Sequence, residues 1–583
     1  MSDSTDPTTD SSGSRRIDAV TLEVIRNACS AIAEEMNANL IRTGYSPNIK
    51  ERRDCSCAVF DDNGRLLSQA ENMPVHLGAM PFSVEAALER YSPESLSPGD
   101  AILVNDPFRG GAHLPDLTLV TPVFADDDIP EDSSGDDRLP LVGFAANRAH
   151  HADIGGSTAG SVAADSTEIY QEGLRIPPVK LYDGGDLVED VMELLLANVR
   201  TPDERRGDIR AQQAANETGR ERLQELASKY GLETLSTAIA EIHDYSERRM
   251  RAEIDHLPDG TYAFSDVLDD DGQGTIDIPI EATVTVDGDT IGVDFEGTAP
   301  QTAGAVNAVF AVTASATYYA VRCVTDPDVP PNDGAYRPIE IDAPEGTVVN
   351  ASPPAAVVGG NLEVSQRVTD VILGALAAVA PERAVAAGQG TMNNVTFGGT
   401  DPRDGTPYAF YETQGGGFGG RSSGDGIDGV HVHMSNTMNT PAEVLQTAYP
   451  LAVERYELRQ DTGGAGRHRG GLGLRRDIRV RDHEPTFSLL ADRRRHAPYG
   501  IDGGSRGGRG DDKLIRDGEE YDLEPKIKRV LEAGDIVSIR TPGGGGYGDP
   551  AARDREAIER DLDLEKCSLE AARDGYRFET SSE

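Results

Sequence analysis

The sequence predicts an α+β protein, a mixed α/β chain of several subdomains with antiparallel hairpins, long helices and a glycine-rich β C-terminal half. Three observations carry this prediction. Apolar residues recur at helical spacing in the first half of the chain, apolar and polar residues alternate between Asp-Gly turns after residue 260, and glycine clusters with short strands follow Gly388. The length of 583 residues also favours more than one subdomain.

Four segments are expected along the chain. Residues 1–16 are polar and low in complexity, with no apolar leader segment, and are expected to form a disordered tail. Residues 17–255 should form an N-terminal α/β subdomain with the candidate site. Residues 256–550 should form a β-rich, glycine-rich subdomain with buried helices, and residues 551–583 a helical tail.

Helices are expected where apolar residues recur every three to four positions. Thr21 is a possible N-cap of the first helix, and Gly231 could break the longest one. The expected helices span residues 17–42, 83–91, 186–199, 204–248, 306–324, 364–380, 551–562 and 569–574.

Strands are expected in short β-branched or alternating runs bounded by turn residues. Asp62-Asn63-Gly64 is a hairpin turn signal, so Glu51, Asp54 and Glu71 should meet at one end of the first hairpin. Residues 126–138 read as an acidic loop and an insertion. The expected strands span residues 55–60, 66–70, 101–105, 117–124, 139–146, 260–264, 274–286 and 290–295.

The composition is strongly acidic. Asp and Glu total 100 against 55 Lys and Arg, only seven of which are Lys, and the formal net charge is −45. Acidic, Lys-poor, Arg-retaining chains without Trp resemble proteins of salt-loving archaea, in which high salt screens carboxylate repulsion. The same charge disfavours nucleic-acid binding.

The cysteines and the hydropathy bear on location. The five cysteines form no CxxC pair, which suits a reducing cytoplasm. Cys55 and Cys57 would share one face of a strand, either as a ligand pair or, more commonly, as two buried thiols. No apolar run approaches the roughly 18 residues of a membrane span. We therefore expect a cytoplasmic protein without membrane association.

The strongest site signal lies in residues 105–156, which hold three of the eleven histidines, each close to an aspartate. If strands 117–124 and 139–146 pair as an antiparallel hairpin, His113-x-x-Asp116 and His150 meet at one end of a sheet. Imidazole and carboxylate suit a divalent metal such as Mn, Zn or Fe. The structural alternative is that the histidines cap strands and hydrogen-bond the aspartates.

Further residues could join this site. Glu51 is a candidate fourth ligand on topology alone, and Arg52 or Arg53 could balance gathered carboxylates as well as a metal could. On an extended segment His150 and His151 point to opposite sides, so His151, with Asp153, could transfer protons while His150 binds a metal.

Other motifs are weaker. His431-x-His433 would share a face if extended and could be a ligand pair, although core or surface histidines are the commoner outcome. Arg467-His468-Arg469 lies in a glycine-rich frame that could hold an anion. The glycine clusters contain no Gly-Lys-Ser/Thr, so the chain shows no ATP site, and tight turns with close backbone packing are the favoured interpretation.

Several motifs in order resemble the hydantoinase B/oxoprolinase family. They are SPNIKERRDCSCAVFD, NMPVHLGAM, NDPFRGGAHLPDLTLVTPVF, NRAHHADIGG, GRHRGGLGLRRDI and TPGGGGYGDPAARD. The resemblance covers nearly the whole chain, from about Ile17 to the last helix. Only the acidic loop at 126–138 lengthens the spacing between two of these motifs.

The resemblance implies a division of labour. A separate hydantoinase A-type subunit would bind ATP and phosphorylate the substrate, and this chain would complete the reaction in a hetero-oligomer. In the carboxylase branch of the family the ligand pattern of a divalent metal resembles Glu51, His113, Asp116 and His150, with His151 or Asp153 as the nearest proton shuttle. The phosphate on the activated substrate would be a good leaving group.

Three functions remain open from the sequence. The first is the B subunit of an ATP-dependent hydantoinase or 5-oxoprolinase that hydrolyses a cyclic amide. The second is a subunit of an ATP-dependent acetone or acetophenone carboxylase. The third is a structural scaffold without activity, in which the histidines only cap strands.

Overall fold

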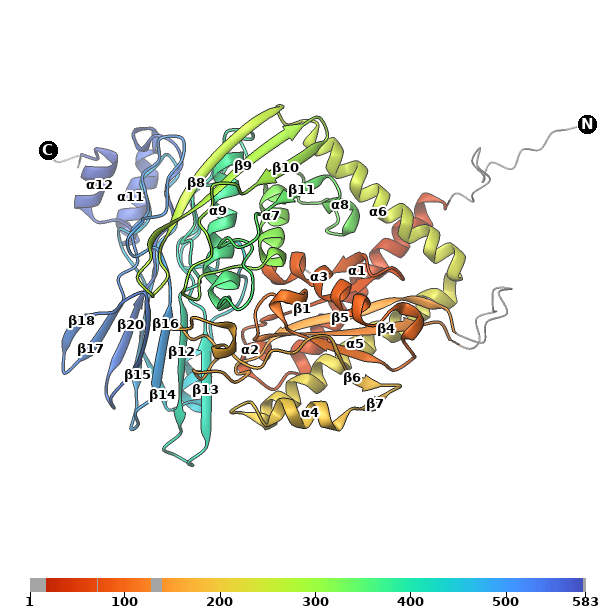
Figure 1. Ribbon diagram of the computed structural model, residues 1–583. Helices are drawn as coiled ribbons and strands as arrows, with labels where there is room; N and C mark the ends of the chain where they lie inside the picture. The colour runs from red at the N-terminus through yellow and green to blue at the C-terminus, as the bar shows by residue number, and fades with distance from the viewer. Residues whose placement is uncertain (1–16, 71, 127–138, 580–583) are drawn as a thin grey trace, which may run out of the picture.

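The computed structural model describes residues 17–70, 72–126 and 139–579, which form four β-sheets and the helices that cover them (Figure 1). The expected tail at 1–16, Glu71 and the loop residues 127–138 lie outside the described residues. The predicted mixed α/β class with antiparallel hairpins is confirmed.

A seven-stranded antiparallel sheet forms the N-terminal part of the chain. Its strand order is β2-β1-β5-β4-β3-β6-β7. The predicted first hairpin and the predicted pairing of the two strands around the acidic loop are both present. The strands are β1 Cys55–Phe60, β2 Leu66–Gln69, β3 Ala101–Val104, β4 Asp116–Phe124, β5 Leu141–His150, β6 Val179–Asp183 and β7 Asp186–Leu187.

Alternate residues of β1 face opposite helical layers, as period-2 geometry requires. Cys55, Cys57 and Val59 pack with the helices α1 (Ala19–Thr43) and α5 (Pro202–Tyr230). Ala58 and Phe60 pack with α3 on the other face. The two thiols are buried, as expected for core cysteines.

Two expected helix starts were wrong. The first helix is capped by Asp18, whose side chain accepts from the backbone N–H groups of Val20 and Thr21, rather than by Thr21. Helix α3 spans Pro74–Arg90 instead of residues 83–91. Gly78 and Pro81 weaken the helical pattern, but Gly78 is needed because a Cβ there would lie 2.5 Å from the Cα of Ser315 on α7.

The middle of the chain packs helices against a second sheet, of order β11-β10-β9-β8. Figure 1 shows α7 and α9 beneath the long β8–β9 hairpin. The expected helix at 306–324 begins only at Phe310, and the expected helix at 364–380 begins with a π-helical turn. The elements are β8 Gly260–Asp270, β9 Ile276–Asp287, β10 Thr290–Asp294, β11 Ile339–Asp342, α7 Phe310–Val324, η4 Gly360–Val364 and α9 Ser365–Leu376.

Two further sheets face each other in the C-terminal part. Phe397, Phe487 and Ile539 are among the buried residues of the shared core between them. Their strand orders are β13-β12-β16-β19 and β14-β15-β20-β17-β18. The strands are β12 Asn394–Thr400, β13 Pro407–Glu412, β14 Leu451–Leu458, β15 Leu474–Val480, β16 Thr486–Leu490, β17 Lys513–Arg516, β18 Glu519–Asp522, β19 Lys526–Val530 and β20 Ile536–Arg540.

The glycine clusters pack backbone against backbone, as predicted. A Cβ on Gly417 would lie 2.0 Å from the carbonyl oxygen of Gly471 and 2.2 Å from the amide nitrogen of Gly544. Three distant segments approach so closely only because their side chains are absent.

The remaining helices complete the layers. The predicted break at Gly231 is confirmed, with α5 ending before it and α6 starting after it. The expected helix at 186–199 is shorter, because residues 186–187 pair as a strand. These helices are α2 Pro47–Lys50, α4 Glu189–Leu196, α6 Leu232–Ile254, α8 Asp333–Tyr336, α10 Ala442–Ala448, α11 Arg555–Asp563 and α12 Leu569–Tyr576, with short turns η1 Pro93–Ser95, η2 Pro107–Arg109, η3 Ile169–Gln171 and η5 Pro550–Ala552.

The largest apolar core joins elements from both sides of residue 255. It includes Leu117 and Leu119 of β4, Ile280 of β9 and Val368 of α9. The expected division at residues 255 and 256 therefore stays a prediction about sequence organisation. In the part of the chain that the structure describes, no helix combines the length and the apolar character needed to cross a membrane.

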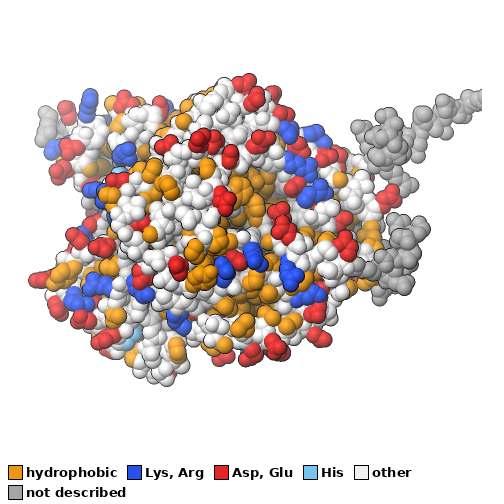
Figure 2. Space-filling model, viewed as in Figure 1, with side chains coloured by type: hydrophobic (Ala, Val, Ile, Leu, Met, Phe, Trp, Pro, Cys, Tyr) orange, Lys and Arg blue, Asp and Glu red, His pale blue; other side chains and the backbone are white. Residues whose placement is uncertain are grey.

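Acidic side chains are spread over the visible surface. Figure 2 shows Asp and Glu scattered among Lys and Arg across that face, without one dominant patch. This distribution fits the expectation of a generally acidic, hydrated surface better than it fits a dedicated site for a cationic partner.

Candidate metal centre

The β4–β5 hairpin brings the predicted histidines and aspartate together. Asp116, the first residue of β4, is directly opposite His150, the last residue of β5. His113 precedes β4 in a loop held by Asn105, whose side-chain amide donates to the carbonyl oxygen of Leu114 at 2.7 Å. The convergence predicted from the antiparallel pairing is confirmed.

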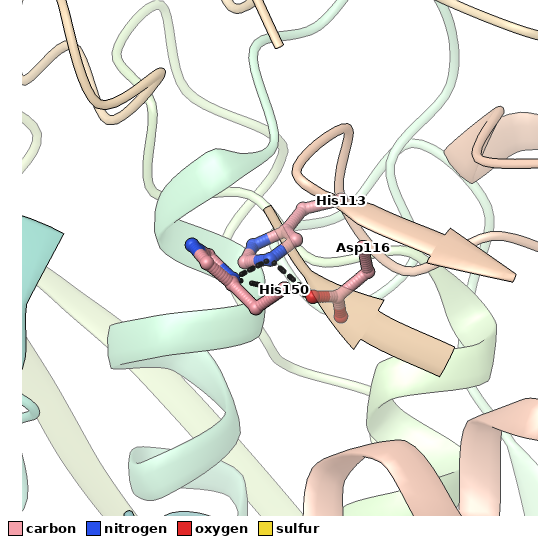
Figure 3. Close-up of side chains that lie close together, drawn as sticks. All are labelled: His113, Asp116 and His150. Atoms are coloured by element: carbon pink, nitrogen blue, oxygen red, sulfur yellow. Dashed lines mark hydrogen bonds and ion pairs between the residues drawn. The ribbon is translucent and has the colours of Figure 1, made fainter. Parts of the chain in front are cut away.

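Three atoms of these residues form a small triangle (Figure 3). His113 Nε2 lies 3.1 Å from Asp116 Oδ1, His150 Nδ1 lies 3.2 Å from the same oxygen, and the two nitrogens are 3.2 Å apart. The side chains of His113 and Asp116 are fully buried and that of His150 is 2% exposed. Among the described residues, this is the one cluster of His, Cys, Asp or Glu with metal-ligand spacing.

The protonation states suit metal ligation. Burial would raise the pKa of Asp116, but His113 and His76 together with hydrogen bonds from His113 and His150 hold it well below 3.8. Burial lowers the pKa of His150. An ionised carboxylate beside a neutral imidazole is the donor set that a divalent cation requires.

Hydrogen bonds alone do not satisfy the triangle. If both imidazoles donate to Asp116 Oδ1, the contact between His113 Nε2 and His150 Nδ1 joins two N–H donors, which repel. A cation among the three atoms would use all three lone pairs. Ligand bonds of about 2.0–2.1 Å around tetrahedral zinc place neighbouring donors roughly 3.3 Å apart, close to the separations here. The residues therefore fit a divalent metal.

Three other side chains contact the triangle or its immediate neighbours from distant elements. His76 Nε2 of α3 lies 3.3 Å from Asp116 Oδ2, although that contact lacks hydrogen-bond geometry, and 3.8 Å from Asp54 Oδ1. The Tyr411 ring stacks on His150 with centroids 4.5 Å apart. Sequence reasoning named neither His76 nor Tyr411, and only the position of His76 just after the first hairpin could have signalled it.

Glu51 does not join the cluster. It is the partly exposed residue that ends α2, and its carboxylate is not among the grouped ligand atoms. The buried acid at this end of the first hairpin is Asp54, which lies 3.5 Å from Arg52 Nη2. Arg52 thus supplies the positive charge that the sequence predicted for gathered carboxylates.

His151 and Asp153 are buried away from the triangle. His151 Nε2 lies 2.9 Å from Gln212 Oε1 of α5, so the predicted opposite orientation of the two neighbouring histidines is present. Burial, with the nearby Arg205, lowers the pKa of His151 to about 4. Asp153 is paired with Arg200 at 2.7 Å and accepts backbone N–H groups, including that of Gly155.

The weaker motifs form no second cluster among the described residues. His433 has a positive φ of 48° and lies 3.3 Å from Asp370, whereas His431 bonds Ser435. Arg469 of the possible anion site is paired with Asp428 at 3.0 Å and with Asp561 at 3.3 Å. Internal pairing therefore accounts for these side chains.

Comparisons with known proteins agree on one family. A family model described as Hydantoinase B/oxoprolinase matches residues 18–550. An uncharacterised protein of Methanocaldococcus jannaschii is 43% identical over 96% of both chains. The B component of a D-/L-hydantoinase from a Pseudomonas species is 36% identical, with 94% of this chain and 93% of that one covered. 5-oxoprolinase 1 of Arabidopsis thaliana is 39% identical over 91% of this chain but only 42% of its own length.

Two solved structures share the fold. An ATP-dependent caprolactamase from Pseudomonas jessenii matches with a TM-score of 0.88 and 30% identity over 98% of both chains. An acetone carboxylase structure matches with a TM-score of 0.85, 18% identity, and 96% of this chain against 79% of that one. The second likeness concerns the fold alone.

Proposed function

This chain belongs to the hydantoinase B/oxoprolinase family, and on that premise we propose that it is the B subunit of an ATP-dependent amidohydrolase that opens a cyclic amide. A hydantoin or 5-oxoproline is the substrate class. The observation that carries the proposal is the buried triangle of His113, Asp116 and His150 in a chain of this family. We also propose that it works in the cytoplasm at high salt.

The lengths of the relatives support a partner subunit. The chain spans 42% of 5-oxoprolinase 1 but 93% of the Pseudomonas hydantoinase component. The remainder of the longer relatives would correspond here to a separate A-type subunit, which would bind ATP and phosphorylate the substrate. No Gly-Lys-Ser/Thr follows any glycine cluster of this chain.

His113, Asp116 and His150 would hold a divalent metal, with Mn, Zn or Fe as the candidates. When bound, such a cation would supply Lewis-acid polarisation of the reacting oxygen. Asp116 contributes its negative charge, because its neighbours keep it ionised despite burial. Tyr411 fixes the ring plane of His150 by stacking. The burial of all three side chains excludes bulk water and strengthens their electrostatic interactions.

Proton transfer by His151 and Asp153, and ligation by Glu51, remain proposals with less support. The Gln212 bond and the Arg200 pair favour a positioning role for the first two residues. They would hold the segment after β5, and with it His150, in place.

The test is an ATP-dependent assay with the A-type partner co-expressed. We expect loss of 5-oxoproline or a hydantoin only when ATP and both proteins are present, with acetone and caprolactam tested beside them. His113→Ala and His150→Ala should abolish turnover, whereas His243→Ala, which alters a buried histidine bonded to Leu66 on another element, should retain it. ATP hydrolysis by this protein in pure form, or full activity of both cluster variants, would contradict the proposal.

A further inference from the structure

A π-helical turn, Gly360–Val364, runs beside the triangle at the start of α9. In Figure 3 a pale green helical segment, the colour of this part of the chain in Figure 1, passes next to the three side chains. Two glycines allow this position: a Cβ on Gly359 would lie 2.6 Å from the carbonyl oxygen of Ala305, and one on Gly360 2.1 Å from that of Asn307. Single π-helical turns often occur at functional sites.

Asn361 of this turn contacts the triangle. Its Nδ2 lies 3.4 Å from His113 Nε2, one of the three grouped atoms. Its side-chain oxygen, Oδ1, is buried and has no hydrogen-bond partner, and the whole residue is only 3% exposed. A buried amide oxygen without a partner costs about 1–3 kcal/mol, so its position beside the triangle needs a reason.

The amide has two orientations with different partners. In the present one Nδ2 donates toward His113 Nε2, which requires a lone pair on that nitrogen. A cation in the triangle would take this lone pair and would repel the amide N–H. A rotation of the amide by 180° exchanges the two atoms in place, removes the repulsion, and directs the unpartnered Oδ1 toward the cation.

We propose that Asn361 supplies a neutral oxygen ligand to the metal centre, through this rotation of its amide. The inference rests on the metal site proposed above and adds a residue outside the His-x-x-Asp and histidine motifs. Amide oxygens are accepted by hard and borderline divalent cations. A neutral fourth ligand adds no charge to a site that already holds the ionised Asp116 and lies near Asp54.

The same turn also supports the second histidine. Glu363 Oε1 accepts from Asn394 Nδ2 at 2.8 Å, and Asn394 Oδ1 accepts from the Tyr411 hydroxyl at 3.1 Å. Tyr411 in turn stacks on His150. The turn therefore reaches His113 directly through Asn361 and His150 through a chain of buried side chains. A shift of the turn would disturb both imidazoles together.

The experiment compares Asn361→Ala and Asn361→Asp with the matched control Asn332→Ala, in the full chain. Asn332 is also a buried asparagine, but it bonds Ser246 on α6. Zn²⁺ affinity is measured by competition with a chelator, and Co²⁺ absorption reports the ligand set without any need for turnover. We expect Asn361→Ala to weaken Zn²⁺ about 10–100-fold and to change the Co²⁺ spectrum. Asn361→Asp should retain binding, and Asn332→Ala should match the wild type.

Two failures are distinguishable. If the wild type binds neither Zn²⁺ nor Co²⁺ stoichiometrically, the proposed metal centre itself fails. If the wild type binds both but Asn361→Ala has unchanged affinity and an unchanged Co²⁺ spectrum, the metal centre stands and the role of Asn361 is refuted. Loss of binding in Asn361→Ala with an unfolded circular dichroism spectrum is resolved by Asn361→Asp, which must then bind the metal for the inference to survive.

Discussion

Removal of one imidazole from the triangle should weaken metal binding by about two orders of magnitude. The free energy of binding at structural zinc sites is about 10–16 kcal/mol, or roughly 3 kcal/mol for each of four ligands. Since about 1.4 kcal/mol is tenfold in Kd, His113→Ala or His150→Ala should raise Kd about 100-fold. Asp116 would keep its charge but lose one of two neighbours that lie 3.1 and 3.2 Å away.

The same change is measurable as stability. At a free metal concentration about 100 times the wild-type Kd, binding stabilises the folded wild type by about 2.7 kcal/mol. A variant with an about 100-fold higher Kd would gain only about 0.4 kcal/mol under the same conditions. Unfolding with and without metal should therefore give a gap of about 2.3 kcal/mol between wild type and variant.

The control is His243→Ala. His243 is as buried as the cluster histidines, but its Nε2 bonds the backbone oxygen of Leu66 at 3.0 Å. It should lose stability equally with and without metal and keep the wild-type Kd. The reasoning is refuted if both cluster variants bind metal like the wild type, or if the control loses as much affinity as they do.

Three further predictions address other parts of the chain. Asp153→Asn should cost about 2 kcal/mol of stability, because it weakens the 2.7 Å pair with Arg200, and should leave metal affinity within about twofold; a large loss of metal affinity would place Asp153 in the site after all. Burial raises the pKa of Glu172 to about 8, so the folded state holds a proton that the unfolded chain releases near 4.5. Stability from this group is complete below pH 4.5 and is lost as the pH rises to 8, by about 1.4 kcal/mol per unit, and urea unfolding should show a shallower fall in Glu172→Gln; equal slopes would contradict this. Gly417→Ala should prevent folding or cost about 4 kcal/mol, since its Cβ would lie 2.0 Å from a backbone oxygen, whereas Gly292→Ala, with open space around its Cβ, should melt within a few degrees of the wild type.

The sequence was sufficient for the core of the candidate site because a single hairpin builds it. Period-2 strands and antiparallel pairing place Asp116 opposite His150 whatever the rest of the fold does. The opposite orientation of His150 and His151 follows from the same geometry, and Gln212 occupies the far side. Local rules were enough wherever the chain contacts a near neighbour in sequence.

The surroundings of the site could not be predicted because they depend on packing between distant segments. Asn361 and Tyr411 follow His150 by more than 200 residues, and no spacing rule connects them. His76 was hidden because α3 contains Gly78 and Pro81, which argue against a helix until its contact with α7 is known. Glu51 failed to join the cluster since the short helix α2 ends there, and Asp54 is the acid that the turn buries.

The excess of arginine over lysine has a structural reason as well as a compositional one. Six of the largest fully buried side chains are arginines, and five of them pair with buried carboxylates, as in Arg367–Asp492 at 2.8 Å and Arg476–Glu412 at 2.9 Å. A guanidinium stays charged when buried and offers several donors in a fixed plane, whereas a buried lysine tends to lose its proton. Salt screens exposed charges over about 3 Å at 1 M but reaches buried pairs far less. The surface carboxylates would then carry the dependence on salt, while the interior pairs and the His113–Asp116–His150 triangle keep their electrostatics at any ionic strength.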